Sequence, residues 1–217
     1  MVTDAYFSMD GDVAPLDDLL DVCKRHDAIL MIDEAHSTGV FGKTGRGLTE
    51  RFGLEGKVPV VMGTLSKALG SVGGFISGKH EIKETLHNFC RPFIYTTAPS
   101  PMASAAALSA LTLIEKDGSL RRRLWENVRF MREALLEAGF DLLGSEGPII
   151  PIKVGDTAKT LRLKEYLKKE GFGISAIRPP TVPKGTDRLR ISVSAVHGRP
   201  AMASLVRCLK IAWKGRR

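Results

Sequence analysis

One lysine, Lys67, lies among glycine, serine and alanine residues, and no carboxylate is close to it in the sequence. Asp33 ends an apolar run upstream, and His36 follows it by three residues. A primary amine in such a loop can form a Schiff base with an aldehyde, and a carboxylate can hold a proton on a heterocyclic nitrogen. Pyridoxal phosphate (PLP) requires both groups, so these residues indicate a PLP site.

Each of these residues also has a simpler interpretation. Asp33 could cap a helix or form a turn, Lys67 could be a solvated surface charge, and His36 could be structural. The glycine-rich loop is not a Walker phosphate-binding loop, because serine precedes Lys67 and alanine follows it. The spacing alone therefore leaves both the PLP enzyme and the structural alternative open.

Two short apolar runs must position these residues. Residues 28–33 and 58–62 predict buried strands of a mainly parallel sheet, and residues 15–27 predict an amphipathic helix before the first of them. Neighbouring parallel strands lie about 4.8 Å apart, so groups at their carboxyl ends can meet on one ligand. This alternation of strands and helices predicts an α/β fold.

The second half of the chain predicts a smaller α/β domain. We place a boundary near residue 115, giving a large-domain portion over residues 1–115 and a small C-terminal domain over residues 116–217. The patterns predict helices over 102–118, 119–140, 159–170 and 199–214 and strands over 73–78, 149–154, 173–177 and 189–194.

The composition is typical of a soluble globular protein, with 43% apolar and 26% charged residues. The basic residues behind the net charge of +8 are scattered, which argues against a nucleic-acid site, and an acidic small molecule fits the charge equally well. The three cysteines have no metal-ligand spacing, which favours reduced thiols in the cytoplasm and no metal site. The chain shows no signal peptide and no membrane span.

Four stretches together resemble the α-oxoamine synthases, which are PLP enzymes with the aspartate-aminotransferase fold (fold type I). They are "FSMDGDVAPL", "MIDEAHSTGVFGKTGRG", "GTLSKALGSVGG" and "FIYTTAPSP". Within this family, "SAIRPPTVPKGTDRLRISVSAVH" is most similar to the 8-amino-7-oxononanoate synthases. The resemblance runs along nearly the whole chain.

This resemblance implies roles for the residues of the first half. Lys67 would carry the cofactor as a Schiff base, Asp33 would pair with its pyridine nitrogen, and His36 would bond to its phenolic oxygen. Ser8 and Thr64 would be further cofactor contacts.

The resemblance also implies substrate contacts and a partner subunit. Arg190 would hold the carboxylate of the amino acid, although Arg178 or Arg188 could take its place, and Thr181 would touch substrate. Thr97 would reach the phosphate of a neighbouring subunit's cofactor, which implies a homodimer with shared active sites.

The implied reaction is the decarboxylative condensation of L-alanine with pimeloyl-CoA or a pimeloyl carrier protein, which gives 8-amino-7-oxononanoate for biotin synthesis. Two alternatives stay open: a glycine-using synthase of the 2-amino-3-ketobutyrate ligase or 5-aminolevulinate synthase type, and an inactive remnant. Members of the family are considerably longer than this chain, so the resemblance implies the C-terminal portion of such an enzyme.

Overall fold

The computed structural model describes residues 1–214 of the chain. The chain divides into two compact units. Unit 1 comprises residues 1–7 and 14–118, and unit 2 comprises residues 8–13 together with the chain from residue 119 onward. The short segment Ser8–Val13 thus packs with residues far away in the sequence.

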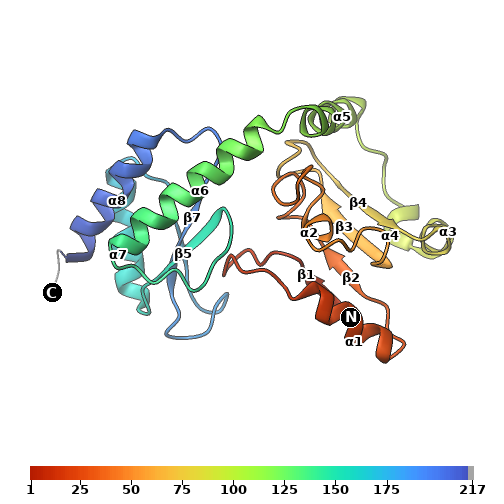
Figure 1. Cartoon of the computed structure of the whole chain (residues 1–217), viewed down its shortest axis with the longest axis horizontal. Helices are drawn as coiled ribbons and strands as arrows, with labels where there is room; N and C mark the ends of the chain where they lie inside the picture. Colours follow the sequence, from red (N-terminus) through yellow and green to blue (C-terminus); the bar gives the residue numbers. More distant parts are fainter. Residues whose placement is uncertain (215–217) are drawn as a thin grey trace. The chain divides into compact units, whose positions relative to one another are not determined.

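Unit 1 is built on a four-stranded sheet with the order β1-β2-β3-β4 (Figure 1). Strands β1 (Val2–Asp4), β2 (Met31–Asp33) and β3 (Val60–Thr64) run parallel. The predicted strands over 28–33 and 58–62 are therefore confirmed, with shifted bounds. Strand β4 (Gly74–Gly78) runs antiparallel to β3, since the turn that carries Lys67 returns the chain directly alongside it.

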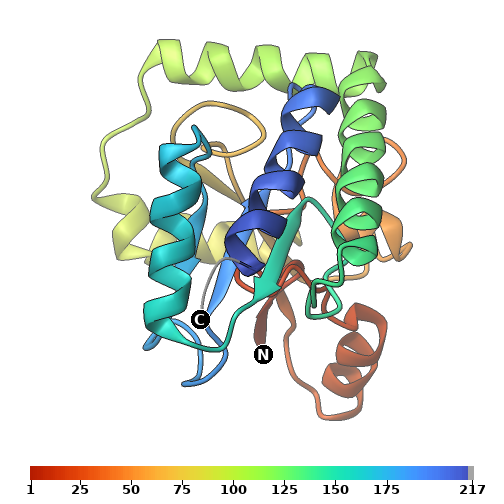
Figure 2. The same ribbon diagram turned by 90° about the vertical axis from the view of Figure 1, so that its left-hand side faces the viewer.

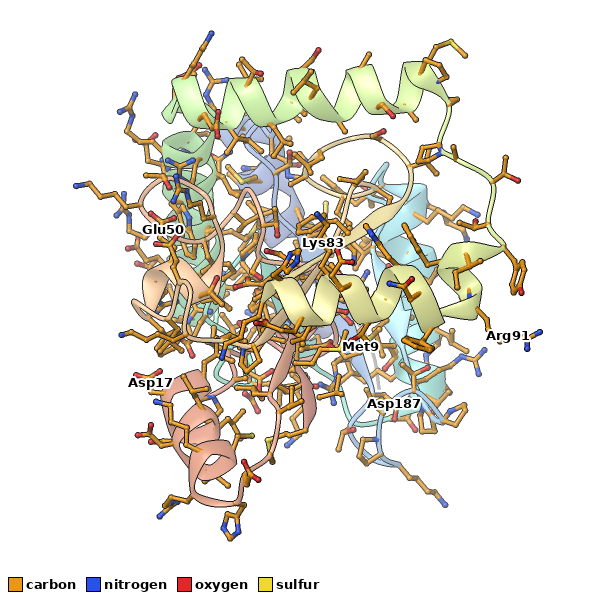
Figure 3. All side chains as sticks on the ribbon, turned by 90° about the vertical axis from the view of Figure 1, so that its right-hand side faces the viewer. Met9, Asp17, Glu50, Lys83, Arg91 and Asp187 are labelled. Atoms are coloured by element: carbon orange, nitrogen blue, oxygen red, sulfur yellow. The ribbon has the colours of Figure 1, made fainter. Side chains whose placement is uncertain are left out.

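The helices of unit 1 differ in how much surface they bury. Helix α1 (Leu16–Arg25) buries one side, with Leu16, Leu20 and Cys23 in the core, and α2 (Leu48–Arg51) is a single turn. Helix α3 (His80–Phe89) and the short α4 (Arg91–Ile94) bury no residue at all. Figure 3 shows Lys83 on α3 and Arg91 at the start of α4, where its side chain points outward. Helix α5 (Pro101–Lys116) buries only Ala107.

Unit 2 places three helices on a three-stranded antiparallel sheet with the order β5-β7-β6 (Figure 2). The strands are β5 (Ile149–Lys153), β6 (Ser175–Ile177) and β7 (Arg188–Ser192). Helix α8 (Arg199–Lys214) packs against both α6 (Ser119–Glu137) and α7 (Thr157–Lys169). The hydrophobic core of unit 2 lies between these helices and the sheet.

Side chains of β7 alternate between the two faces of the sheet, as the pleat of a strand requires. Leu189 and Ile191 are buried in the helix-covered core. Arg188 and Arg190 point to the opposite face and bond to the segment Ser8–Val13. Gly11 of that segment has φ +67°, and a Cβ there would collide with the carbonyl oxygen of Ile149, so the close approach requires glycine.

Within residues 1–214, no helix is both long enough and apolar enough to cross a membrane. The same residues contain no group of three or more His, Cys, Asp or Glu side chains arranged to hold a metal ion.

Candidate functional site in unit 1 and an arginine site in unit 2

Two carboxylates lie side by side at the carboxyl ends of β1 and β2. The strand register pairs Asp4 with Asp33, so both side chains project from the same face of the sheet. The pKa of Asp4 is raised, chiefly by burial and also by the charge of Asp33, while the charge of Lys67 opposes the rise. Asp33 and Lys67 therefore both act electrostatically on Asp4, which places the three side chains in one neighbourhood.

The loop that carries Lys67 is closed by its own backbone. The Leu65 N–H donates to the Gly73 carbonyl (2.9 Å), the Ser71 N–H donates to Leu65 (2.7 Å), and the Gly70 N–H donates to Lys67 (3.1 Å). The Lys67 side chain is left exposed. These bonds fix the backbone of Lys67 and so the point from which its amine extends.

Thr64, the last residue of β3, uses its hydroxyl inside this loop. Its Oγ1 donates to the carbonyl of Gly73 (3.1 Å), accepts from the Ser66 N–H (3.2 Å) and lies 2.8 Å from the Ser66 hydroxyl. Thr64 therefore stabilises the lysine loop.

The loop after Asp33 holds that carboxylate and approaches the lysine loop. Asp33 Oδ1 accepts the N–H of Ala35 (2.7 Å), which fixes the side chain at the end of β2. A Cβ at Gly39 would lie only 2.8 Å from the Cβ of Ala68, so the two loops pack closely. His36 is half-buried in the first turn of the same loop.

Two acidic residues at this site were missed by the sequence reasoning. Asp4 ends β1 as Asp33 ends β2, so the repeated strand-terminal aspartate was an available signal. Glu34 is 1% exposed and accepts the N–H groups of Leu48 (2.9 Å) and Thr49 (2.6 Å), which begin α2. Only its position beside Asp33 could have drawn attention to it.

Unit 2 contains the remaining candidates, and its two strand arginines differ sharply. The Arg188 side chain is buried, pairs with Asp10 and donates from Nε to the Thr186 carbonyl (3.0 Å). Arg190 donates from Nη1 to the Ser8 carbonyl (2.9 Å), while its Nε is buried without an acceptor among residues 1–214. The recorded bonds therefore engage only Nη1 of Arg190, whereas they engage all three side-chain nitrogens of Arg188.

Two further features concern the predicted substrate contacts. Arg190 borders a cavity of about 300 Å³ that Ser175, Ser192 and His197 also line. Thr181 is exposed in the loop before β7, and its N–H donates to the Arg178 carbonyl (3.1 Å). Unit 2 thus holds Ser8, Thr181 and Arg190, while unit 1 holds the residues around Lys67.

Thr97 lies in unit 1, in the exposed segment between α4 and α5. The apolar residues before it are unusually exposed for their size: Phe89 (78%), Phe93 (55%) and Tyr95 (77%). Large apolar side chains gathered in this way are typical of a surface that another polypeptide covers.

Several curated relatives with similar sequences are named 8-amino-7-oxononanoate synthase. The chain is 45% identical over 197 residues to 8-amino-7-oxononanoate synthase of Symbiobacterium thermophilum, with 91% of this chain and 50% of the relative covered. It is 46% identical over 207 residues to that of Cellvibrio japonicus, with 95% and 52% covered. The chain therefore spans about half the length of the curated relatives it matches.

Two solved structures also match nearly the whole of this chain and only part of their own length. The serine palmitoyltransferase of Sphingomonas wittichii matches with a TM-score of 0.93 and 34% identity over 98% of this chain and 54% of that one. The 8-amino-7-oxononanoate synthase of Francisella tularensis matches with a TM-score of 0.86 and 30% identity over 98% of this chain and 62% of that one. The predicted α/β fold of the aspartate-aminotransferase type is confirmed. Since the model of the aminotransferase class I and II family matches residues 1–209, the chain belongs to that family.

Proposed function

We propose that this chain is the lysine-bearing part of an 8-amino-7-oxononanoate synthase, a PLP-dependent acyltransferase of biotin synthesis. The observation that carries the proposal is the exposed amine of Lys67 on a closed loop that follows β3, the strand paired with the one that ends at Asp33. The names of the relatives at 45–46% identity support this choice.

The residues at the site fit PLP. The cofactor requires a reachable amine and a carboxylate with a free oxygen near it; Lys67 is exposed, and the recorded bond of Asp33 engages only Oδ1. A similar solved chain is described as a serine palmitoyltransferase with PLP. When bound, PLP supplies an aldehyde for the lysine and an electron-withdrawing ring that stabilises a carbanion at the amino-acid Cα.

Three side chains of unit 1 would hold, hydrogen-bond or transfer protons around this ring. Asp33 would hold a proton on the pyridine nitrogen, because a carboxylate beside that nitrogen favours its charged form. His36 would hydrogen-bond the phenolic oxygen. Lys67, displaced by the incoming amino acid, would remove the proton from its Cα as a general base.

The remaining candidate residues would bind and orient the substrate and the cofactor. Arg190 would hold the substrate carboxylate, since its recorded bonds engage only Nη1 and guanidinium groups bind carboxylates through paired donors. Thr181 would contact substrate, and Ser8 and Thr64 would contact the cofactor. Each of these roles follows from the family motif at that position.

The net reaction joins the Cα of L-alanine to the acyl carbon of a pimeloyl thioester. The C–S bond breaks with release of the thiol, the alanine carboxylate leaves as CO₂, and a proton returns to the Cα. The bond formed and the bonds broken balance without an oxidant or reductant. The acyl carrier is either CoA or a carrier protein.

A spectroscopic titration tests this function. The purified chain is mixed with PLP, and an absorption band of the lysine-bound cofactor is expected at about 420 nm. Lys67→Ala should abolish the band, whereas Lys57→Ala, which removes an exposed lysine outside the loop, should keep it. A wild-type chain without the band would contradict the proposal.

The same titration identifies which amino acid is the substrate. Addition of L-alanine should change the band, and glycine or L-serine should not. A response to glycine alone would favour a glycine-using synthase, and a response to serine alone would favour a serine palmitoyltransferase.

We also propose that the functional form is a homodimer in which Thr97 reaches the partner's cofactor phosphate. The exposed apolar side chains of Phe89, Phe93 and Tyr95 support a covered surface there. Light scattering should give the mass of a dimer, and Phe93→Glu should lower it to that of a monomer. A monomeric wild-type chain would contradict this arrangement.

A further inference from the structure

Glu34 is a buried carboxylate with no role in the function proposed above. It directly follows Asp33 and is 1% exposed. Its carboxylate accepts hydrogen bonds from the Leu48 N–H (2.9 Å), the Thr49 N–H (2.6 Å) and the Ser37 hydroxyl. A buried carboxylate is costly unless such donors surround it, so the arrangement serves a purpose that an apolar side chain could not.

The backbone of Glu34 is equally engaged. Its N–H donates to the Met62 carbonyl of β3 (2.8 Å), and its carbonyl accepts the N–H groups of Ser37 (3.0 Å) and Thr38 (2.9 Å). The turn that contains His36 is therefore held by hydrogen bonds to the Glu34 carbonyl. Through its backbone and side chain together, Glu34 hydrogen-bonds β3, the His36 turn and the start of α2.

A glycine provides the space for this carboxylate. Gly47, just before α2, has φ +107°, and a Cβ there would collide with Oε2 of Glu34. The Gly47 N–H donates to the Phe41 carbonyl (3.0 Å), so the loop that starts at Asp33 is closed a second time at its far end. The buried acid and the glycine thus form one complementary pair.

We propose that Glu34 is a positioning residue for the cofactor site. Its carboxylate fixes the backbone that presents Asp33 and His36, and cofactor affinity depends on it through those two residues. The proposal rests on the proposed function, because Asp33 and His36 are its cofactor contacts.

Glu50 offers a matched control in the same loop. It accepts the N–H groups of Thr44 (2.8 Å) and Arg46 (3.0 Å) and therefore also holds backbone with a carboxylate. Its recorded bonds reach none of residues 33–38 (Glu50 is labelled in Figure 3). Loss of Glu50 should loosen the loop without disturbing the Asp33–His36 turn.

The experiment compares Glu34→Gln with Glu50→Gln in the full chain. Without cofactor, hydrogen exchange at the amides of Ser37, Thr38, Leu48 and Thr49 should accelerate in Glu34→Gln and stay at the wild-type rate in Glu50→Gln. In a PLP titration, the dissociation constant should rise roughly tenfold for Glu34→Gln and less than about twofold for Glu50→Gln. Only Glu34→Gln removes the charged acceptor of the hydrogen bonds that hold the backbone next to Asp33 and His36. The pH midpoint of the band near 420 nm should move only in Glu34→Gln, because this variant reorients the groups that hold protons on the cofactor.

A purely structural role predicts different results. Glu34→Gln would then lower stability as Glu50→Gln does, while the PLP dissociation constant and the pH midpoint would match the wild type; that outcome overturns the inference and leaves the proposed function intact. A wild-type chain without a Lys67-dependent band overturns both. If Glu34→Gln does not fold, Ser37→Ala removes a single donor to this carboxylate and should still weaken PLP binding a few-fold; unchanged binding overturns the inference.

Discussion

Asp10 and Asp12 lie two residues apart in the segment Ser8–Val13, and alanine substitutions of the two are expected to have opposite effects on unit 2. Asp10 pairs with Arg188, whose side chain is only 4% exposed, while that of Asp10 is 48% exposed. Asp12 has a buried Oδ1 that meets no hydrogen-bond donor among residues 1–214. The carboxylate of Asp10 pairs with a buried charge, whereas that of Asp12 has one buried oxygen without a donor.

The expected changes in the stability of unit 2 follow from how far each carboxylate and its partner are buried. Removal of one partner of a fully buried ion pair costs about 3–5 kcal/mol, but water reaches this pair from the side of Asp10, so Asp10→Ala should cost about 2 kcal/mol. Arg188 keeps its bonds to Thr186, which prevents a larger loss. Asp12→Ala relieves an unsatisfied buried oxygen and should leave unit 2 unchanged or more stable by roughly 0.5 kcal/mol at neutral pH.

Both tryptophans of the chain, Trp125 and Trp213, lie in unit 2, so their fluorescence reports on its unfolding. In urea, Asp10→Ala should lower the unfolding midpoint by about 1 M at an unchanged slope, and Asp12→Ala should not lower it. Burial, together with the charges of Asp10 and Glu146, raises the pKa of Asp12.

A raised pKa in the folded state means that the contribution of Asp12 to stability is greatest in acid and is lost as the pH rises. Any gain from Asp12→Ala should therefore grow from acid to neutral pH. Equal losses for both variants would refute this reasoning, because they would show that the segment is held by its backbone and not by the ion pair.

Two further substitutions test unit 1. Gly47→Ala places a side chain at φ +107° against the Glu34 carboxylate and should lower the free energy of unfolding by about 3 kcal/mol, measured by circular dichroism in urea. The control is Gly53→Ala, at φ +64° with no atom within 4 Å of its Cβ, which should lower the free energy of unfolding by only about 1 kcal/mol. Because burial raises the pKa of Asp4 in the folded state, Asp4→Asn should increase the stability of unit 1 by roughly 0.5 kcal/mol at neutral pH and have no effect in acid. An unchanged difference across this pH range would contradict the assigned pKa direction.

The sequence alone determined those features that depend on neighbouring residues. The apolar runs that end at Asp33 and near Thr64 form strands, and the helix over 199–214 has the bounds that its pattern predicted. The glycine and serine residues around Lys67 indicated a loop, because such residues break regular structure and allow tight turns. The family motifs then suggested the cofactor and a role for each site residue, and those roles stay predictions.

Only the tertiary structure decided which distant groups meet. Strand β4 pairs antiparallel with β3, the segment Ser8–Val13 joins unit 2, and Asp10 pairs with Arg188 while Arg190 bonds to the Ser8 carbonyl. Asp4 and Glu34 became visible as site residues only when strand register and hydrogen bonds were known. A local pattern records which face of an element is apolar, whereas register, burial and charge pairing depend on residues tens to hundreds of positions away, so no short stretch of sequence can specify them.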